Sequence, residues 1–282
     1  MMNLKTDVSL ADGQTMPLQG LGLYKVTNQS AMDQVVQTAW QQGYRLFDTA
    51  QLYQNEQQVG QAIKAVGMDR SDVFVTTKVA EENQGYDATL RSVEASLNAL
   101  QMDYVDLLMV HWPIHQHFFA TWQAFERLQA EGMVKSLGVS NFNMVQLQYL
   151  ATQANVMPVV NQIENHPHLS QVALRRFNEE QNIITQAWAP LGRGTVLAEP
   201  IITTLAERYQ KSPAQIVLRW HVQNGVSIIP KSSQPARILE NGAIYDFALT
   251  DEEMALIDSL NTFQRLGREP AQVYEYGAQY PR

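Results

Sequence analysis

Short apolar runs alternate with longer amphipathic stretches along almost the whole chain. The runs are rich in β-branched residues and apolar at successive positions, which is typical of strands buried on both faces of a parallel sheet. They predict eight strands, at residues 18–22, 44–48, 73–78, 104–111, 134–140, 158–164, 183–188 and 226–230. The stretches between them have the spacing of helices, and several end in glycine, a common helix stop.

Eight strand–helix units in a chain of 282 residues predict a (β/α)₈ TIM barrel, an α/β fold, as a single domain over residues 1–282. The Asp12-Gly13 dipeptide, which favours tight turns, predicts a β-hairpin before the first barrel strand. A doubly wound open sheet is the alternative, but it usually carries a complete GxGxxG turn, which GLGLYKV lacks. The C-terminal residues 261–282, with three tyrosines, are expected to form a loop over the active-site face of the barrel.

The composition is that of a globular protein with one large core, because 45% of the residues are hydrophobic and 17% are charged. A formal net charge of -8 argues against general binding to nucleic acid or to anionic membranes. The chain has no cysteine, which excludes disulfides. We find neither a signal peptide nor a run of about 18 apolar residues, so a cytoplasmic protein is expected.

Three polar residues close predicted strands, and a fourth lies just beyond one of them. Asp48, Lys78 and His111 each end an apolar run, and Tyr53 follows Asp48 by a few residues. The C-terminal ends of barrel strands converge on the face that carries the chemistry. We therefore expect these four side chains to meet in one pocket.

Each of the four has a plainer interpretation when it is taken alone. Asp48 fits a helix cap at a strand-to-helix turn, and Tyr53 fits an aromatic residue at the edge of the core. Lys78 could be a solvated surface lysine, although it ends an unusually apolar strand. His111 could be a hydrogen-bonded core histidine. Only their combination indicates chemistry.

Together the four groups make a proton-donating site. A tyrosine with a pKa near 10 is a poor acid at neutral pH, but a neighbouring Lys78 ammonium would favour the phenolate and lower that pKa. Asp48 would hold Lys78 in place, and His111 would orient a substrate carbonyl. Tyr53 would then be a general acid toward an oxygen on which negative charge develops, as carbonyl reduction by hydride requires.

Six sequence blocks resemble, in order, the signature segments of the aldo-keto reductase family. They are GYRLFDTAQLYQNE (43–56), TTKV (76–79), HWP (111–113), GVSNF (138–142), NQIENHP (161–167) and IPKS (229–232). Within that family the chain looks most like the bacterial 2,5-diketo-gluconate reductase type. The resemblance implies the barrel, an NADPH cofactor bound without a Rossmann fold, and the catalytic tetrad Asp48, Tyr53, Lys78 and His111. It also implies a monomer that reduces aldehydes and ketones, such as dicarbonyls, keto acids, keto esters and sugar-derived carbonyls, to alcohols.

The same resemblance gives roles to the remaining strand ends. Ser140, Asn141 and Gln162 would hydrogen-bond the nicotinamide carboxamide, although Ser140 and Asn141 could instead cap the next helix. Trp188 resembles the aromatic residue that stacks on the nicotinamide ring, and a core tryptophan is the alternative. The following stretch 189–194, which includes Leu191, could wrap a pyrophosphate with its backbone amides.

The segment 230–241 after the last strand would bind the far end of the cofactor, because phosphate sites near the final loops are frequent in such barrels. Lys231, Arg237 and the Ser232 hydroxyl would hold the 2′-phosphate, and arginine can do so with two parallel hydrogen bonds. Glu240 and Asn241 would face the adenine. The alternative is a solvated basic turn.

Two departures from the family pattern indicate an open substrate pocket. Ala80 stands where many relatives carry a tryptophan, and the segment after Pro113 is short. The side chains expected to form the walls of this pocket are Tyr24, Leu52, Ala80, Trp112, Phe142 and the C-terminal tyrosines.

Two other functions remain as hypotheses. Five histidines, at positions 111, 115, 117, 166 and 168, raise the possibility of a metal-dependent barrel hydrolase. Metal ligands normally include a carboxylate or other partner on converging strand ends, so we expect no metal. The second alternative is a cofactor-binding sensor without turnover, against which the complete tetrad argues.

Overall fold

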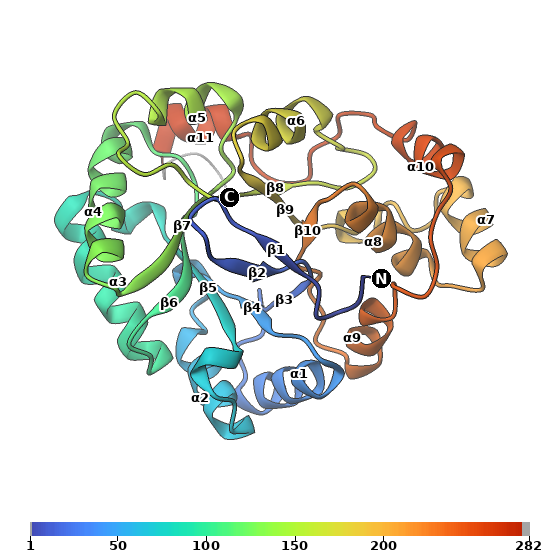
Figure 1. Ribbon diagram of the computed structural model, residues 1–282, viewed down its shortest axis with the longest axis horizontal. Helices are drawn as coiled ribbons and strands as arrows, with labels where there is room; N and C mark the ends of the chain where they lie inside the picture. Colours follow the sequence, from blue (N-terminus) through green and yellow to red (C-terminus); the bar gives the residue numbers. More distant parts are fainter. Residues whose placement is uncertain (1, 278–282) are drawn as a thin grey trace.

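Eight parallel strands form a nearly closed barrel with helices around it, as Figure 1 shows for the computed structural model, which describes residues 2–277. The strands neighbour one another in chain order: β3 (Gly20–Gly22), β4 (Leu46–Asp48), β5 (Phe74–Val79), β6 (Val105–Val110), β7 (Val134–Ser140), β8 (Val160–Glu164), β9 (Ile184–Trp188) and β10 (Ser227–Ile228). The first and last strands approach each other where Gly22 N donates to Pro230 O at 3.2 Å and Ile228 N to Leu18 O at 3.0 Å. The (β/α)₈ prediction is confirmed.

All eight predicted strands are present, and most begin one or two residues later than predicted. The delay has a visible cause at β4, where the backbone amide of Tyr44 donates to Ala39 O in the preceding helix at 2.9 Å. Tyr44 thus still belongs to the end of that helix, and the strand starts only at Leu46. Apolar character alone did not mark this boundary, because Tyr44 at the end of the helix and Leu46 at the start of the strand are both apolar.

The predicted hairpin is also present, with β1 (Asp7–Ser9) antiparallel to β2 (Thr15–Pro17). Its connection runs over residues 10–14 and is closed by the Leu10 amide donating to Gln14 O at 2.9 Å, so it is longer than the tight turn expected from Asp12-Gly13. Leu10 and Met16 pack against residues inside the barrel. In Figure 1 the hairpin lies across one end of the barrel, where it closes the core.

The α-helices pack around the barrel and bury their apolar faces against it. They are α1 (Gln29–Gln42), α2 (Glu56–Val66), α3 (Tyr86–Leu100), α4 (Phe118–Ala130), α5 (Met144–Leu150), α6 (Val172–Glu180), α7 (Pro200–Tyr209), α8 (Pro213–Gln223), α9 (Pro235–Gly242), α10 (Asp251–Asp258) and α11 (Pro270–Tyr276). Short 3₁₀ turns include η1 (Gln51–Tyr53), η3 (Glu81–Asn83), η4 (His115–His117) and η5 (Gly192–Gly194). No helix within residues 2–277 is both long and apolar enough to span a membrane.

The C-terminal segment differs in part from the expected loop. Residues 261–269 are irregular, but residues 270–276 form α11, which begins at a proline, a residue well suited to the first turn of a helix. Val273 of α11 is fully buried against Trp112 and Ile114. Because Trp112 follows the end of β6, the segment does lie at the C-terminal face of the barrel. The last of the three expected wall tyrosines, Tyr280, lies outside the described residues.

Candidate active site

The four residues predicted to converge do meet at the C-terminal end of the barrel. Lys78 Nζ lies 2.6 Å from Asp48 Oδ1, 2.9 Å from Thr49 O and 3.5 Å from the Tyr53 hydroxyl. The rings of Tyr53 and His111 pack edge to face with their centroids 5.7 Å apart. A phenol, an ammonium, a carboxylate and an imidazole therefore share one site.

The local structure excludes the plainer interpretations of two of these residues. Asp48 does not cap a helix, because Asn55 occupies the N-cap position of α2 and Ala50 that of η1. Lys78 is fully buried and so cannot be a solvated lysine. A buried ammonium is costly unless it is paired, which accounts for the close Asp48 carboxylate.

The pKa of Tyr53 differs from the expectation. Burial raises the pKa of Tyr53 well above its ordinary value, and the charges of Asp48 and Tyr24 add to that rise. Burial outweighs the effect expected from Lys78, whose ammonium lies 2.6 Å from Asp48 and whose own pKa is lowered by burial. The predicted tuning of Tyr53 toward neutral pH is therefore wrong for the protein alone. The Tyr53 hydroxyl therefore carries its proton at neutral pH.

A hydrogen-bond network joins the tetrad to the predicted nicotinamide residues. Gln162 Nε2 donates to Asp48 Oδ2 at 2.9 Å, and the Ser140 hydroxyl donates to Gln162 O at 3.0 Å. Asn141 Nδ2 bonds Ser140 Oγ at 3.0 Å, and Trp188 Nε1 donates to Asn141 Oδ1 at 2.8 Å. These side chains come from four strand ends, so the network connects strands β4, β7, β8 and β9 at the C-terminal face of the barrel.

The capping alternative for Ser140 and Asn141 is excluded by the same region. Asn143 is the N-cap of α5 and forms a reciprocal capping box with Gln146. Asn141 instead has a left-handed backbone, with φ +64°, and its side-chain amide also donates to His111 O at 3.0 Å. Trp188, whose surface is partly exposed, is not an enclosed core residue either.

The stretch 189–194, expected to wrap a pyrophosphate with its backbone amides, is a tightly wound loop that includes η5. Ala189, Gly192, Arg193 and Gly194 all have positive φ. The amide of Gly192 donates to Ala189 O and that of Gly194 to Leu191 O, each at 2.8 Å. Leu191 packs on the core formed by α7 and α8. The role of its amides in binding a pyrophosphate stays a prediction.

Three cations without carboxylate partners in the described part of the chain lie near the end of β10. They are Lys231 and Arg237, which were predicted to bind the cofactor, and Lys25, which was not. Burial and then the charge of Lys25 lower the pKa of Lys231, so the two ammonium groups lie within electrostatic reach of each other. Neither they nor Arg237 forms an ion pair with a carboxylate within residues 2–277. Mutually repelling, exposed cations without a carboxylate fit a polyanionic ligand such as the phosphates of NADPH.

Lys25 could have been found from its position, since it follows the first barrel strand in the loop GLGLYK, on the catalytic face. The other predicted residues of this region lie in the same segment after β10. Ser232 is buried, and its hydroxyl accepts from the Gln234 amide at 3.0 Å. Glu240 and Asn241 lie on α9, where their backbone oxygens accept from Gln215 and Gln19.

The predicted substrate walls divide into two groups. Tyr24 is half-exposed and its ring centroid lies 4.9 Å from that of Tyr53, while Leu52 is partly exposed beside it in η1. Trp112 is nearly buried at the end of β6. These three have positions suited to a wall.

Ala80 and Phe142 have more enclosed positions. Ala80 is buried, and its amide donates to Gln51 Oε1 at 2.9 Å. Phe142 stacks on Phe118 at 5.3 Å within the main core, so the structure gives it a packing role rather than the predicted pocket wall. Its apolar character was the only sequence signal, and that signal does not separate a wall from a core.

The histidines do not assemble into a metal centre in the described part of the chain. Over residues 2–277, histidine, aspartate and glutamate side chains form no group of three or more that could hold an ion. His166 instead bonds Glu164 Oε1 at 3.1 Å, and His168 bonds Glu199 Oε1 at 2.7 Å. The hydrolase hypothesis is therefore without a ligand set here.

Comparison with known proteins gives consistent matches over nearly the whole chain. The model of the aldo/keto reductase family matches residues 15–262. Glyoxal reductase of Bacillus subtilis (strain 168) is 44% identical over 268 residues, covering 95% of this chain and 97% of that protein. Methylglyoxal reductase DkgA of Salmonella typhimurium is 42% identical, covering 95% and 98%. A crystal structure of a Gox0644 mutant in complex with NADPH is 42% identical, with a TM-score of 0.90 and coverage of 95% and 98%.

Proposed function

The chain belongs to the aldo/keto reductase family, and we propose that it reduces small dicarbonyl compounds to hydroxycarbonyls with Tyr53 as the proton donor. As a member of that family it is an NADP-dependent oxidoreductase that acts on carbonyl groups. The observation that carries the finer proposal is the position of Lys78 Nζ, 2.6 Å from Asp48 and 3.5 Å from the Tyr53 hydroxyl.

The residues of this chain fit the cofactor at both of its ends. Lys25, Lys231 and Arg237 would hold the phosphate groups, since they are cations without carboxylate partners in the described part of the chain. Ser140, Asn141, Gln162 and Trp188 would hold the nicotinamide end. When bound, NADPH supplies the hydride for the carbonyl carbon.

The protein's own groups handle the proton. Tyr53 holds its proton firmly because burial raises its pKa, so the hydroxyl donates a hydrogen bond to a substrate carbonyl before it transfers the proton. The Lys78 ammonium faces the Tyr53 oxygen and stabilises the phenolate once the proton has left. His111, whose ring meets Tyr53 edge-on, is placed to orient the same carbonyl.

Small dicarbonyls are the proposed substrates for two reasons. Two of the relatives are named for glyoxal and methylglyoxal, at 44% and 42% identity. Around the tetrad, the proposed walls are the rings of Tyr24 and Trp112, which offer aromatic faces to a small substrate. Keto acids, keto esters and sugar-derived carbonyls are secondary candidates.

The experiment is to follow NADPH oxidation by absorbance at 340 nm with glyoxal, methylglyoxal, a keto ester and an aldose as substrates. We expect the highest kcat/KM with the two dicarbonyls. Tight NADPH binding without turnover on any carbonyl would instead favour the sensor hypothesis. Turnover confined to aldoses or keto acids would overturn the proposed substrate class but not the chemistry.

Monomeric state and cytoplasmic location remain predictions of the sequence. Light scattering coupled to gel filtration tests the first, with a mass of 31.9 kDa expected for one chain.

A further inference from the structure

A buried carboxylate at the end of β8 holds the C-terminal segment against the barrel. Glu164 is fully buried; its Oε1 accepts from the Leu266 amide at 2.6 Å, and its Oε2 accepts from the Gly267 amide at 3.0 Å. His166 Nε2 bonds Oε1 at 3.1 Å, and Arg265 lies 3.6 Å from Oε2. One carboxylate thus fixes two successive peptide groups that are about a hundred residues away in the chain.

These bonds keep Glu164 charged inside the protein. Burial alone would raise the pKa of Glu164, but the hydrogen bonds from His166, Leu266 and Gly267, together with the charge of Arg265, hold it below its ordinary value. Hydrogen bonds to an ionised acceptor are about twice as strong as neutral ones. The backbone at Leu266 and Gly267 is therefore held firmly, and it cannot move without exposing a buried charge.

The fixed backbone lies directly against the edge of the Trp188 indole. A Cβ atom at Gly267 would come within 2.5 Å of Trp188 Cη2 and 3.2 Å of Cζ2. Only a residue without a side chain fits, although the φ of Gly267 lies outside the left-handed region and would suit other residues. Glu164 and Trp188 are also register partners on β8 and β9, so the carboxylate, the glycine and the indole form one unit.

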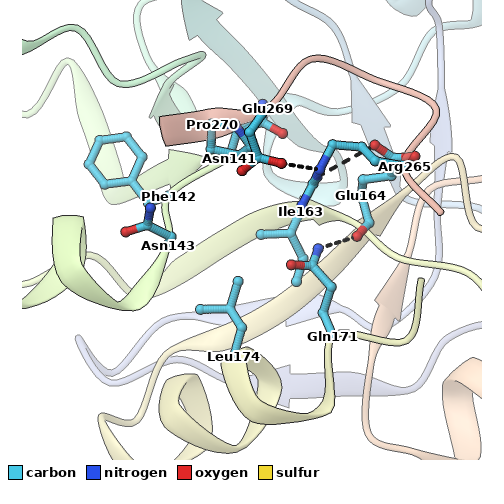
Figure 2. A pocket seen from close by; sticks show the side chains of 10 residues that line it. All are labelled: Asn141, Phe142, Asn143, Ile163, Glu164, Gln171, Leu174, Arg265, Glu269 and Pro270. Carbon is cyan, nitrogen blue, oxygen red and sulfur yellow. Dashed lines mark hydrogen bonds and ion pairs between the residues drawn. The ribbon is translucent and has the colours of Figure 1, made fainter. Parts of the chain in front are cut away.

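A second buried pair anchors the segment on the other side of the barrel. Arg268 forms an ion pair with Glu81 of η3 and lies over the Trp112 ring, with its guanidinium carbon 4.3 Å from the ring centroid. Figure 2 shows the anchor at β8, where the Arg265 guanidinium lies between the carboxylates of Glu164 and Glu269. Residues 265–268 are thus held at both ends, above strands β5 and β8.

The indole of Trp188 is fixed by two contacts on different parts of the ring. Its Nε1 donates to Asn141 Oδ1 at 2.8 Å, and its Cζ2–Cη2 edge meets Gly267. Asn141 belongs to the network that reaches the tetrad through Ser140 and Gln162. Removal of the Gly267 contact would take away one of the neighbours that orient the ring, the others being Asn141 and the apolar cluster of Trp112, Ile114 and Val273.

We propose that Glu164 and Gly267 are positioning residues for the nicotinamide subsite: the carboxylate fixes the Leu266–Gly267 backbone, and that backbone sets the orientation of Trp188. The inference rests on the proposed function, because Trp188 matters only if the cofactor binds beside it.

The test measures the Kd of NADP⁺, without substrate, for Gly267→Ala, Glu164→Gln, Trp188→Phe and the Gly267→Ala/Trp188→Phe double variant. The added methyl group must displace the indole, so Gly267→Ala should raise the Kd of NADP⁺ at least about fivefold. It should also change the fluorescence emission of Trp188, which is identified as the part of the emission that Trp188→Phe removes. Phenylalanine lacks the Cζ2–Cη2 edge. In that background Gly267→Ala should change the Kd by less than about twofold.

The control is Glu253→Gln. Glu253 is also a buried carboxylate that accepts from a backbone amide and from an arginine, but it lies on α10, away from the C-terminal segment. The substitution should lower the stability and leave the Kd unchanged. If Gly267→Ala binds NADP⁺ as the wild type does, or weakens binding equally in both backgrounds, the positioning role is wrong. If the wild type itself does not bind NADP⁺, the proposed function fails instead. If Glu164→Gln does not fold, the Kd of the Gly267→Ala variant alone decides whether the positioning role holds.

Discussion

Lys78 and Asp48 form a fully buried ion pair, with 2.6 Å between Nζ and Oδ1, at the base of the candidate active site. A buried pair of this kind is rarely a net source of stability, because desolvation offsets most of the attraction. Its position below the Tyr53 hydroxyl gives it another use. The pair holds a positive charge 3.5 Å from the Tyr53 oxygen, which would become a phenolate in the proton transfer that we propose.

Removal of one partner should therefore affect stability and catalysis separately. Lys78→Met leaves the Asp48 carboxylate buried and unpaired, which should cost about 3–5 kcal/mol in the free energy of unfolding. The double variant Asp48→Asn/Lys78→Met should regain most of that stability, but kcat should stay at least about a hundredfold below the wild type in both variants. Urea unfolding and NADPH oxidation measure the two effects.

Lys211→Met is the matched control, because Lys211 pairs with the exposed Asp246 at 2.6 Å on the outside of the barrel. It should change the free energy of unfolding by less than about 1 kcal/mol and leave kcat unchanged. Recovery of activity in the double variant would contradict the role assigned to the Lys78 charge.

The repeating strand–helix pattern was enough to predict the barrel, and the polar residues at strand ends were enough to predict the tetrad. Convergence follows from topology alone, so Asp48, Lys78 and His111 could be brought together without any side-chain geometry. The pKa of Tyr53 could not be predicted in the same way. It depends on how deeply the ring is buried and on how close the Asp48 and Tyr24 side chains lie, which only the three-dimensional structure gives.

Contacts between segments that are far apart in the chain could not be predicted from the sequence either. Glu164 and Gly267 are about a hundred residues apart, and neither has a neighbour in the chain that indicates a partner. Phe142 illustrates the opposite error, since an apolar residue after a strand end fits a pocket wall and a core position equally well. Lys25 was overlooked because a single lysine in a loop has no pattern, although its place after the first strand was informative.

The cations beside β10 should determine the preference for NADPH over NADH. Lys231→Ala and Arg237→Ala should each raise the Kd of NADPH by about tenfold to a hundredfold, because each removes hydrogen bonds to a charged phosphate. The Kd of NADH should hardly change. Fluorescence titration of both nucleotides measures the ratio, with Arg127→Ala on α4 as a remote surface control. An unchanged ratio would remove these residues from the cofactor site.

Acid should destabilise the protein partly through His221. Burial lowers the pKa of His221 to about 3, with smaller effects from Arg175 and His166, while the Pro190 carbonyl opposes the shift. In the unfolded chain the pKa is about 6.5. Between these values the unfolded state binds more protons, so the stability is complete above pH 6.5 and falls as the pH drops toward 3.

At pH 5 this loss should be about 2 kcal/mol, since one pKa unit corresponds to about 1.4 kcal/mol. His221→Gln should reduce the difference in the free energy of unfolding between pH 7.5 and pH 5 by that amount, whatever its effect at pH 7.5. His117→Gln, on the exposed η4 turn, should leave the difference unchanged. Parallel pH dependences of His221→Gln and wild type would show that His221 does not titrate in this way.

Tyr24 should contribute to substrate binding rather than to folding. Its side chain is half-exposed, and its ring meets Tyr53 at 4.9 Å. Tyr24→Ala removes one wall of the pocket and should raise the KM for methylglyoxal about twofold to tenfold, the value of an aromatic contact. Steady-state kinetics beside Leu256→Ala, an exposed residue on α10, measure the effect. Equal KM values for the two variants would place the substrate elsewhere.

The central claim is that the Tyr53 hydroxyl donates the proton, and Tyr53→Phe tests it most directly because it deletes one oxygen and keeps the ring packed on Tyr24 and His111. The measurement is kcat for methylglyoxal reduction together with the Kd of NADPH. We predict that kcat falls by at least about a hundredfold while the Kd stays within about twofold of the wild type. A variant that keeps the wild-type kcat would contradict the account, because another group would then supply the proton.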